Sequence, residues 1–593
     1  MIDSHRLHSA YQTARHELLT QRVEAGHWVG RLSNSALSTA TATSALALVA
    51  ANTSDDSRRR AGNELAARGI AWLAGAQNDD GGWGDTDRST SNIATTMLVQ
   101  AAFHLAGAAE ANRGLLTRAK EYIDRQGGTE GLRRRYGVDK TFAVPILTNC
   151  ALAGLVPWGE VAPLPFELAA LPFPMLRFLR LPVVSYAVPA LVAIGQARFF
   201  HQRPRNPLVW LLRRCAVWPS MKALTGMQPA SGGYLEAAPL TSFVVMSLAA
   251  TGRADHPVAR RGIRFLLDSV REDGSWPIDT NLATWNTTLS VQALAAATGE
   301  VGALGCIDWL LDCQYDARHP FTNAAPGGWA WSDASGAVPD ADDTAGALMA
   351  LAVLERSASQ SRRERIRTEA AEGVRWLLDL QNRDGGWPTF CRGWGTLPFD
   401  RSGADLTAHA IRALATWAGT GAESQRIGEA ISAGFDFLSQ RQRPDGSWVP
   451  LWFGNQHHPE EENPVFGTTR VLLAYRDLGK IAGDAAQRGL QWLCASRCVD
   501  GGWGCGLPDR GESSIEETAL AIDALLSDPD NPALRPVLED GLAWLIRAVE
   551  EGRHRQAAPI GLYFARLWYY ECLYPMIFTV SALGRAVRVL DQK

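Results

Sequence analysis

The chain has 593 residues, 46% of them hydrophobic and 20% charged, which is enough for two folded domains with substantial cores and excludes an intrinsically disordered protein. A net charge of -4 and an isoelectric point near 6.3 give no global positive field, so no nucleic-acid partner is expected.

The N-terminal residues Met1 to His8 contain no apolar core of the kind that signal peptides have, so we expect a protein that faces the cytoplasm. The nine cysteines are scattered along the chain, as expected for reduced thiols. The only close group is Cys494, Cys498 and Cys505, which lacks the paired CxxC or flanking His of a zinc site. No metal site is predicted.

An internal repeat runs through most of the chain. In each copy an aromatic residue is followed eleven residues later by a Trp, after a turn of the Asp-Gly type, and most copies carry a Gln five residues after the first aromatic residue. The pairs are Trp72 with Trp83, Phe265 with Trp276, Trp376 with Trp387, Phe437 with Trp448, and Trp492 with Trp503. Two copies have Val270 and Arg497 in place of the Gln. A longer copy runs from Trp309 to Trp329, and weaker ones lie at Gln228 to Tyr234 and at Gly541 with Trp544.

Each copy predicts the end of an amphipathic helix, with the Gln bonding to the following turn and the Trp folding back onto the helix. Runs rich in Ala and Leu at helical spacing lie between the copies, for example 344–354 and 404–415. Because almost no alternating strand pattern is present, the fold class should be all-α. Repeated helix pairs form either an open solenoid or a closed ring, and the period alone does not choose between them.

Residues 158–215 form the most apolar part of the first half of the chain. The stretch is too short and too broken by Pro and Arg to cross a bilayer, which needs about 20 apolar residues. It suits a helix in the plane of a membrane surface, or alternatively a helix buried between domains. On the first interpretation Arg203, Arg205, Arg213 and Arg214 would meet anionic headgroups, at about 1 kcal/mol each.

The sequence Asp340-Ala341-Asp342-Asp343 places three carboxylates within four residues. In a site poor in water, full ionisation of this cluster would be costly, so one carboxyl group should keep its proton. A protonated, desolvated acid among aromatic rings can protonate an alkene. The simpler interpretation is a helix N-cap before the apolar run that begins at Thr344.

Together these features resemble class II terpene cyclases of the squalene-hopene cyclase type. The repeat resembles the QW motif of that family, Asp340 to Asp343 its DxDD motif, and the segment from Leu573 to Arg585 its C-terminal end. The resemblance implies two α/α barrels: residues 1–25 and 283–593 form the barrel with DxDD, and residues 26–282 form a second barrel inserted into the first. It also implies an active site between the barrels and a peripheral, monotopic enzyme on the cytoplasmic face of the membrane, with an isoprenoid substrate and no cofactor. A homodimer is a further expectation.

By motif position the resemblance implies that Asp342 is the proton donor and that Asp340 and Asp343 flank it. Asp405 and His409 match a second segment of the family, in which the Asp holds the His and the His bonds to the acid. Aromatic residues would stabilise the cation at about 0.5 to 2 kcal/mol per contact. The motif positions imply Trp331, Phe390 and Trp285, and weaker candidates are Trp452, Tyr563, Trp568 and Tyr574.

Several positions depart from the squalene-hopene pattern and leave the substrate and product open. The N-terminal segment Asn34 to Ala42 lacks the usual acidic residue, and Asn286 stands where the family has Asp. The stretch 455–462 is longer and more charged, and Leu562-Tyr563-Phe564 replaces a Gly-Phe-Pro type of segment. A reshaped site that ends the reaction at another cation is therefore expected.

Three alternatives remain at this level. A cyclase for a shorter or oxygenated prenyl substrate would keep the same motifs. A non-catalytic isoprenoid-binding relative would keep the repeats but lose the acid. A protein prenyltransferase subunit would need an Asp/Cys/His zinc set, which does not stand out in this sequence.

Overall fold

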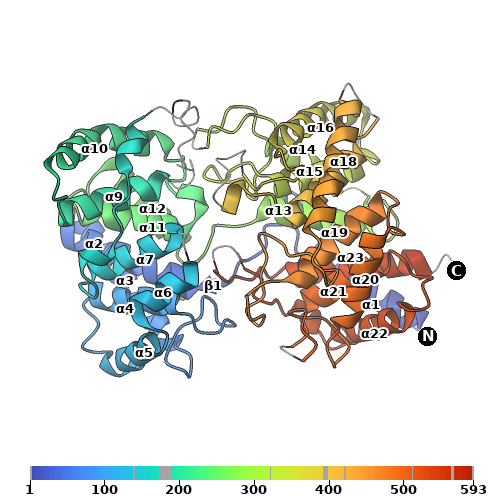
Figure 1. Ribbon diagram of the computed structural model, residues 1–593, viewed down its shortest axis with the longest axis horizontal. Coiled ribbons are helices and arrows are strands. Elements are labelled where there is room, and N and C mark those ends of the chain that lie inside the picture. Colours follow the sequence, from blue (N-terminus) through green and yellow to red (C-terminus); the bar gives the residue numbers. More distant parts are fainter. Residues whose placement is uncertain are drawn as a thin grey trace.

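The computed structural model describes residues 3–137, 140–171, 175, 188–302, 304–320, 322–390, 398–419, 423–509, 512–561 and 566–590. Over these residues the regular structure is helical, apart from an antiparallel pair of two-residue strands, β1 (Asn34–Ser35) and β2 (Trp276–Pro277). The predicted all-α class is confirmed. Figure 1 shows two lobes, with both chain ends in the same lobe and β1 in the region between the lobes.

In the lobe that holds both termini, the inner helices form a closed ring. Each packs against the next, and the last packs against the first. In order they are α13 (Ala283–Ala295), α15 (Ala341–Glu355), α17 (Ala404–Thr416), α19 (Pro464–Asp477), α21 (Ile515–Leu525) and α23 (Tyr574–Leu590). An outer layer packs on this ring, made of α1 (Ser4–Thr20), α14 (Ile307–Asp312), α16 (Gln360–Leu380), α18 (Ser424–Arg441), α20 (Asp484–Ala495) and α22 (Arg535–Glu550). We call this lobe the C-terminal ring.

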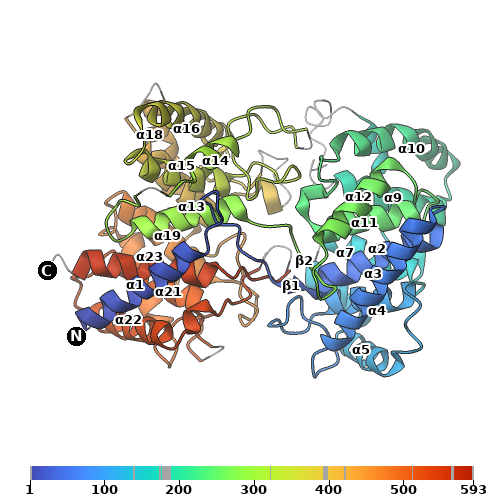
Figure 2. The same ribbon diagram turned by 180° about the vertical axis from the view of Figure 1, so that it is seen from behind.

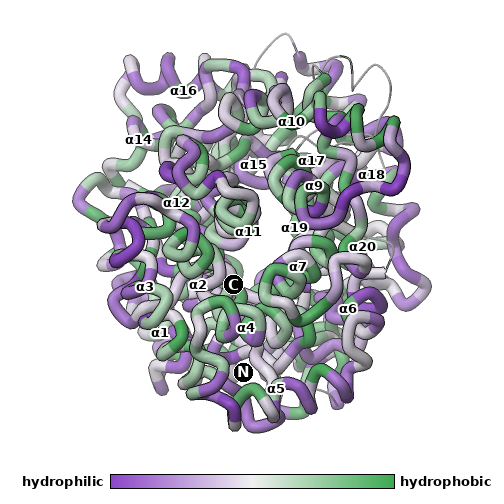
Figure 3. The backbone as a smooth tube through the Cα atoms, turned by 90° about the vertical axis from the view of Figure 1, so that its left-hand side faces the viewer, coloured by the Kyte–Doolittle hydropathy of each residue, from purple (hydrophilic) through white to green (hydrophobic). Residues whose placement is uncertain are grey.

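The other lobe, the N-terminal ring, is built in the same way. Figure 3 shows its inner helices around a common centre. They are α2 (Ala36–Asn52), α4 (Ile93–Leu105), α7 (Lys140–Leu152), α9 (Val188–His201) and α11 (Ala238–Ala249), and α11 packs against α2 to close the ring. The outer helices are α3 (Asp56–Gly75), α5 (Arg113–Arg125), α6 (Gly128–Tyr136), α10 (Pro207–Met227) and α12 (Pro257–Ser269).

The hydrophobic cores assign segments to the two rings. Leu7 and Leu18 of α1 share one core with the inner helices of the C-terminal ring, although they lie at the opposite end of the sequence. A second core joins α2, α4 and α11. Figure 2 shows α1 beside α22 and α23, which it contacts. The exact limits given above, residues 25 and 282, stay a prediction.

Composition separates the inner helices from the outer ones. Helix α2 is rich in Ala, Ser and Thr and is buried on nearly all sides, because small side chains allow neighbouring helices to approach from every direction. Helix α16 instead exposes a charged face, whereas Ile366, Val374 and Leu377 pack inward. An outer helix such as α16 therefore buries one apolar stripe, whereas an inner helix such as α2 is buried on nearly all sides.

The predicted folding of each repeat onto its helix is confirmed. The Trp387 indole donates to the Leu377 carbonyl at 2.9 Å, and the Gln381 amide donates to the carbonyls of Gly385 and Ala430, at 2.8 and 2.9 Å. The second acceptor lies on the next outer helix, so the Gln joins neighbouring repeats. The same indole-to-Leu bond is made by Trp83, Trp276, Trp329, Trp448 and Trp503. Trp28, which the sequence repeat missed, bonds to Leu18 in the same way.

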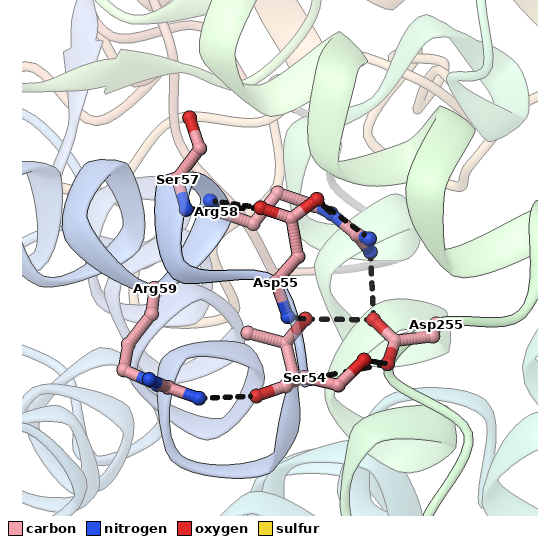
Figure 4. A network of polar contacts seen from close by, with 7 residues as sticks. Ser54, Asp55, Ser57, Arg58, Arg59 and Asp255 are labelled. Atoms are coloured by element: carbon pink, nitrogen blue, oxygen red, sulfur yellow. Dashed lines mark hydrogen bonds and ion pairs between the residues drawn. The ribbon is translucent and has the colours of Figure 1, made fainter.

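A polar network fixes the start of α3 in the N-terminal ring (Figure 4). Asp55 caps α3 by accepting from the backbone N–H groups of Ser57 and Arg58, at 2.9 and 3.0 Å. Arg58 also donates to Asp255 at 2.8 Å, and Asp255 accepts from the Thr53 hydroxyl at 2.7 Å. Because Asp255 lies in the turn between α11 and α12, the network joins this turn to the connection between α2 and α3.

The apolar stretch 158–215 contributes η2 (Phe166–Ala170), α9 and α10, whereas residues 172–174 and 176–187 of it lie outside the described residues. Helix α10 packs on α9 and η2 and exposes large apolar side chains, Leu208 at 76% and Trp218 at 80%. One expectation was wrong: Arg213 is buried, 3.4 Å from Glu167. No helix in the described part of the chain is long and apolar enough to cross a membrane.

Candidate functional site

The DxDD segment forms the N-terminus of α15. Asp340 is the N-cap, and its side chain accepts the backbone N–H of Asp343 at 2.8 Å. The cap interpretation therefore holds for Asp340, but not for the whole motif. Burial raises the pKa of Asp340 to about 7 and raises that of Asp343 well above its usual range. These directions agree with the expectation that the cluster does not ionise fully.

Asp342 makes the central contact of the site. Its Oδ1 lies 2.6 Å from Nδ1 of His409 on α17, and the side chains are 16% and 3% exposed. Burial lowers the pKa of His409, against the effect of Asp342, so the imidazole favours its neutral form. The structure thus brings together the two residues that the sequence placed 67 positions apart.

The expected bond from Asp405 to His409 is absent from the described residues. Asp405 instead accepts the backbone N–H groups of Leu451 and Trp452, at 3.0 and 3.5 Å. The physical reason is that Asp405 lies at the first turn of α17 and meets the neighbouring loop, whereas His409 lies one turn deeper and reaches α15. Burial, with Asp342 nearby, raises the pKa of Asp405 to about 6.

Aromatic rings from separate segments gather beside this acid. Phe390 lies 6.0 Å from Trp331 and 5.8 Å from Trp452, ring centre to ring centre. The Trp452 indole donates to the Thr389 hydroxyl at 2.9 Å, which fixes the ring. Phe399, which sequence reasoning missed, lies 5.2 Å from Phe390. These rings share one apolar cluster with side chains of α9 and η2, so the cluster spans both lobes.

The remaining four aromatic candidates lie in different places. Trp285 packs edge-on against His409, with ring centres 5.9 Å apart. Tyr574 is fully buried, and its hydroxyl lies 3.5 Å from that of Tyr569, a residue the sequence analysis missed. Trp568 is buried at the junction of the lobes, where its backbone N–H donates to Asp85 at 2.8 Å. Tyr563 lies outside the described residues.

A common hydrogen bond aligns the inner helices of the C-terminal ring with one another. In each case the backbone N–H of a repeat aromatic residue donates to a Thr hydroxyl in the first turn or two of an inner helix. The pairs are Trp28 with Thr287, Trp329 with Thr344, Trp387 with Thr407, Trp448 with Thr468, and Trp503 with Thr518, at 2.9 to 3.0 Å. Each Thr therefore faces the outer layer.

Helical periodicity then determines which residues face the centre of the ring. A residue two positions from the Thr is rotated by about 200° and points away from the outer layer. Two positions before the Thr lies what we call the first layer: Trp285, Asp342, Asp405, Phe466 and Glu516. Two positions after it, one turn deeper, lies the second layer: Leu289, Gly346, His409, Arg470 and Leu520. Asp342 and His409 thus belong to adjacent layers on adjacent helices.

Two charged members of these layers were missed by the sequence analysis. Glu516 is completely buried, and burial, with Glu517 beside it, raises its pKa to about 8. Arg470 is buried on α19 and lies 5.2 Å from the Phe466 ring. The available signal was position: Ser514 to Thr518 repeats the pattern of Asp340 to Thr344, and Arg470 interrupts an apolar inner helix.

The described residues contain no group of three or more His, Cys, Asp or Glu arranged to hold a metal ion. The chemistry that this arrangement can perform is proton transfer from a desolvated carboxyl group to a weak base, next to aromatic faces that stabilise positive charge.

Comparison with known proteins agrees with this chemistry. Residues 281–588 match the family model described as "Squalene-hopene cyclase C-terminal domain", and residues 11–208 match "Squalene-hopene cyclase N-terminal domain". A terpene cyclase-glycosyl transferase fusion protein of Humicola fuscoatra is 28% identical over 96% of this chain and 49% of its own length. A probable squalene-hopene cyclase of Sinorhizobium fredii is 28% identical over 58% of this chain and 56% of its own.

This chain therefore spans about half the length of these two relatives. Among solved structures, ent-copalyl diphosphate synthase from Streptomyces platensis matches 98% of this chain and 99% of its own, with a TM-score of 0.57 and 19% sequence identity. At that identity the likeness shows the fold alone.

Proposed function

This chain belongs to the squalene-hopene cyclase family, and from that premise we propose that it is a class II triterpene cyclase. It protonates a terminal alkene of squalene or a close relative and closes rings through carbocations, to give a hopanoid-like or other cyclic triterpene. The observation that carries the proposal is the 2.6 Å contact between Asp342 and His409, in a buried site flanked by the carboxyl groups of Asp340 and Asp343.

The first step transfers a proton from Asp342. In the reactive form the Nδ1–H of neutral His409 donates to Asp342 Oδ1, and the acidic proton is carried by Oδ2. That O–H bond breaks as the terminal alkene carbon gains the hydrogen, which leaves a tertiary cation on the substrate and a carboxylate on Asp342. The hydrogen bond from His409 stabilises this carboxylate, because bonds to a charged acceptor are the stronger ones.

The cation then moves along the chain of alkenes as each ring closes. Trp331, Phe390 and Trp452 offer ring faces that stabilise positive charge without a nucleophile that would trap it, at about 0.5 to 2 kcal/mol per contact. Trp285 does the same beside His409. Preorganised groups of this kind generally supply a large part of the barrier reduction in enzymes. Loss of a proton gives an alkene, and capture of water gives an alcohol.

The test is incubation of the detergent-solubilised protein with squalene, with Asp342→Asn as the control, followed by gas chromatography and mass spectrometry of the extract. A cyclic triterpene made by the wild type alone would support both the reaction and the acid. A product from oxidised squalene or from a shorter prenyl chain, with none from squalene, would overturn the assigned substrate and keep the reaction type.

We also propose that α10 holds the protein on a membrane surface as a monotopic enzyme on the cytoplasmic face. Leu208, Leu211 and Leu212 are each more than half exposed, and Trp218 is exposed on the same helix. Arg203, Arg205 and Arg214 are exposed nearby, where anionic headgroups would attract them. The homodimer expected above stays a prediction.

Sedimentation with liposomes tests this part of the proposal. We expect Leu208→Glu combined with Trp218→Glu to reduce binding at least tenfold, because two large apolar side chains are withdrawn from lipid. The matched control is Val499→Glu, which changes an equally exposed apolar residue on the C-terminal ring. Equal binding by all three proteins would contradict the assignment of α10.

A further inference from the structure

Arg470 is a buried cation without an ionic partner. It is 8% exposed, and within the described part of the chain it forms no ion pair and no hydrogen bond, while its Nη2 is fully buried. Its guanidinium lies over the face of Phe466, 5.2 Å from the ring centre, on the same helix. Burying a charge without a partner costs free energy, so Arg470 needs an explanation that packing does not give.

His409 has an acceptor atom that lacks a donor. Its Nδ1 is occupied by Asp342, but its Nε2 is buried and has no hydrogen-bond partner among the described residues. With the proton on Nδ1, Nε2 is an acceptor. Arg470 Nη2 is a donor without an acceptor, so the two orphaned atoms have opposite needs.

The ring geometry brings these two residues to the same place. Both belong to the second layer, His409 on α17 and Arg470 on α19, and these helices pack against each other. Gly346 occupies the second layer on α15, where a Cβ atom would lie 3.6 Å from Cε1 of His409. The imidazole therefore lies against the bare backbone of α15, and Arg470 stands at the same level on the helix that packs on the other side of α17.

We propose that Arg470 is a positioning residue for the acid: its guanidinium donates to a buried water that in turn donates to Nε2 of His409, and so holds the tautomer that donates to Asp342. The inference rests on the proposed function and deepens it. A tautomer of histidine is set by the hydrogen bond made by its other ring nitrogen. The fixed positive charge also stabilises the carboxylate that remains on Asp342 after proton transfer.

The electrostatics of the site support this arrangement. Among the carboxylates that act on Arg470, Asp342 has the strongest effect, ahead of Asp405 and Asp523. Arg470 in turn has the larger effect of the two guanidinium groups that lower the pKa of His409, in addition to the still larger effect of burial. In this protein the permanent positive charge beside the acid is then a guanidinium, and the imidazole stays neutral.

Three substitutions separate the two properties of Arg470. Arg470→Lys keeps the charge and a donor, Arg470→Gln keeps only a donor, and Arg470→Met removes both. With squalene as the probe, we expect Arg470→Met to lower kcat by about 10- to 100-fold with little change in KM, as loss of a charge-assisted hydrogen bond predicts. Arg470→Lys should recover most of the rate, and Arg470→Gln should lie between.

The control is Arg412→Met, which removes the other guanidinium group that lowers the pKa of His409 and breaks its ion pair with Asp477. Because Arg412 has no orphaned donor among the described residues, it reports the effect of a lost charge alone, and its loss of rate should be smaller than that of Arg470→Met. A double-mutant test adds His409→Ala: Arg470→Met should cost clearly less in that background than in the wild type, because only the direct effect of its charge on Asp342 then remains to be lost. Equal losses in both backgrounds, or a loss with Arg470→Lys as large as with Arg470→Met, would overturn the proposal.

A measurement without turnover separates this inference from the proposed function. Nitrogen NMR of histidine-labelled protein, assigned with His409→Ala, reports which ring nitrogen carries the proton. We expect Nδ1–H in the wild type and a mixture of tautomers in Arg470→Met, with both proteins folded by thermal melting. An unchanged His409 spectrum in Arg470→Met would sink the inference even if squalene is cyclised, and a wild type inactive on squalene would contradict the function alone.

Discussion

Both rings repeat two hydrogen bonds, from an aromatic residue's backbone N–H to a Thr hydroxyl and from a Trp indole to a Leu carbonyl, which we call the hydrogen-bonding frame. The rings carry different residues at the first-layer positions. In the N-terminal ring Trp83, Tyr234 and Trp276 donate their backbone N–H groups to Thr96, Thr241 and Thr39, all at 3.0 Å, as in the other ring. Two positions before each Thr lie Ala94, Pro239 and Leu37, all apolar. The equivalent residues of the C-terminal ring include Asp342, Asp405 and Glu516.

This difference teaches that the repeat builds a scaffold and leaves the first layer free to vary. The Trp-to-Thr bond and the indole-to-Leu bond satisfy buried backbone groups in both rings, which explains why their residues recur. First-layer side chains take no part in that frame. They also lie at helix N-termini, where a carboxylate is favoured by the helix dipole, so acids are tolerated at these positions if a function needs them.

The largest effect is expected from Asp342→Asn, which removes the acid that distinguishes the C-terminal ring. The amide cannot donate an acidic proton, so turnover of squalene should fall at least 1000-fold, within the range that general acids contribute. The helix should persist, because Asp340 and not Asp342 is the N-cap. Circular dichroism and product analysis check both parts, and an active Asp342→Asn variant would remove the proposed acid.

Glu516 tests how much stability a buried acid in the first layer costs. Its pKa is raised from 4.5 to about 8, so the native state binds the extra proton between these values and stability is lost as the pH rises through them. The loss should be on the order of 5 kcal/mol for the wild type. Glu516→Gln, whose amide does not titrate, should lose less stability than the wild type between pH 5 and pH 9, and its remaining decline should come from Asp340, Asp405 and Glu517, whose pKa values burial also raises.

A parallel decline of the two proteins over that pH range would contradict the assignment. A matched control is Glu517→Gln. Burial raises the pKa of Glu517 to about 7, and its Oε1 accepts from Asn455 and Asn463, at 3.1 and 2.8 Å. Because Gln keeps an acceptor oxygen there, Glu517→Gln should remove a separate and smaller part of the pH dependence than Glu516→Gln.

His409→Ala should slow initiation by about 10- to 30-fold, the cost of one hydrogen bond to a charged group. The product distribution should stay the same, since His409 contacts the acid rather than the later cations. The measurement is kcat together with the ratio of products. A changed product at an unchanged rate would rule out the role given to His409.

The smallest effect sharpens the comparison between the rings. Thr344→Val and Thr96→Val each remove the acceptor of a buried Trp backbone N–H, and each should cost about 1 to 2 kcal/mol of stability. Only Thr344→Val should also lower turnover, because Asp342 lies two residues away on the same helix. Denaturant unfolding and squalene assays of both variants would show whether the frame of each ring is equally stabilising.

Much of the site could be predicted because motif and repeat are local. The Trp and Gln spacing predicted the folded-back indole, and the acidic cluster predicted carboxyl groups that resist ionisation. The expected bond between Asp405 and His409 was wrong. A spacing of four residues puts both side chains on one face of α17, but it does not show which groups of other segments each one meets. Asp405 accepts from the loop at Leu451, and His409 contacts Asp342 on α15. Arg213 was placed at the surface for a similar reason, since the sequence does not show the Glu167 that it meets.

The sequence by itself determined the helical class, the repeat frame, the family and the acidic motif, because each depends on spacings within a few turns of chain. Only the tertiary structure decided which residues face one another across the ring. Closure of α23 onto α13 completes the ring, which puts Arg470 and His409 at the same level on neighbouring helices and buries Glu516. These outcomes depend on desolvation and on contacts between residues far apart in the chain, which no local pattern encodes.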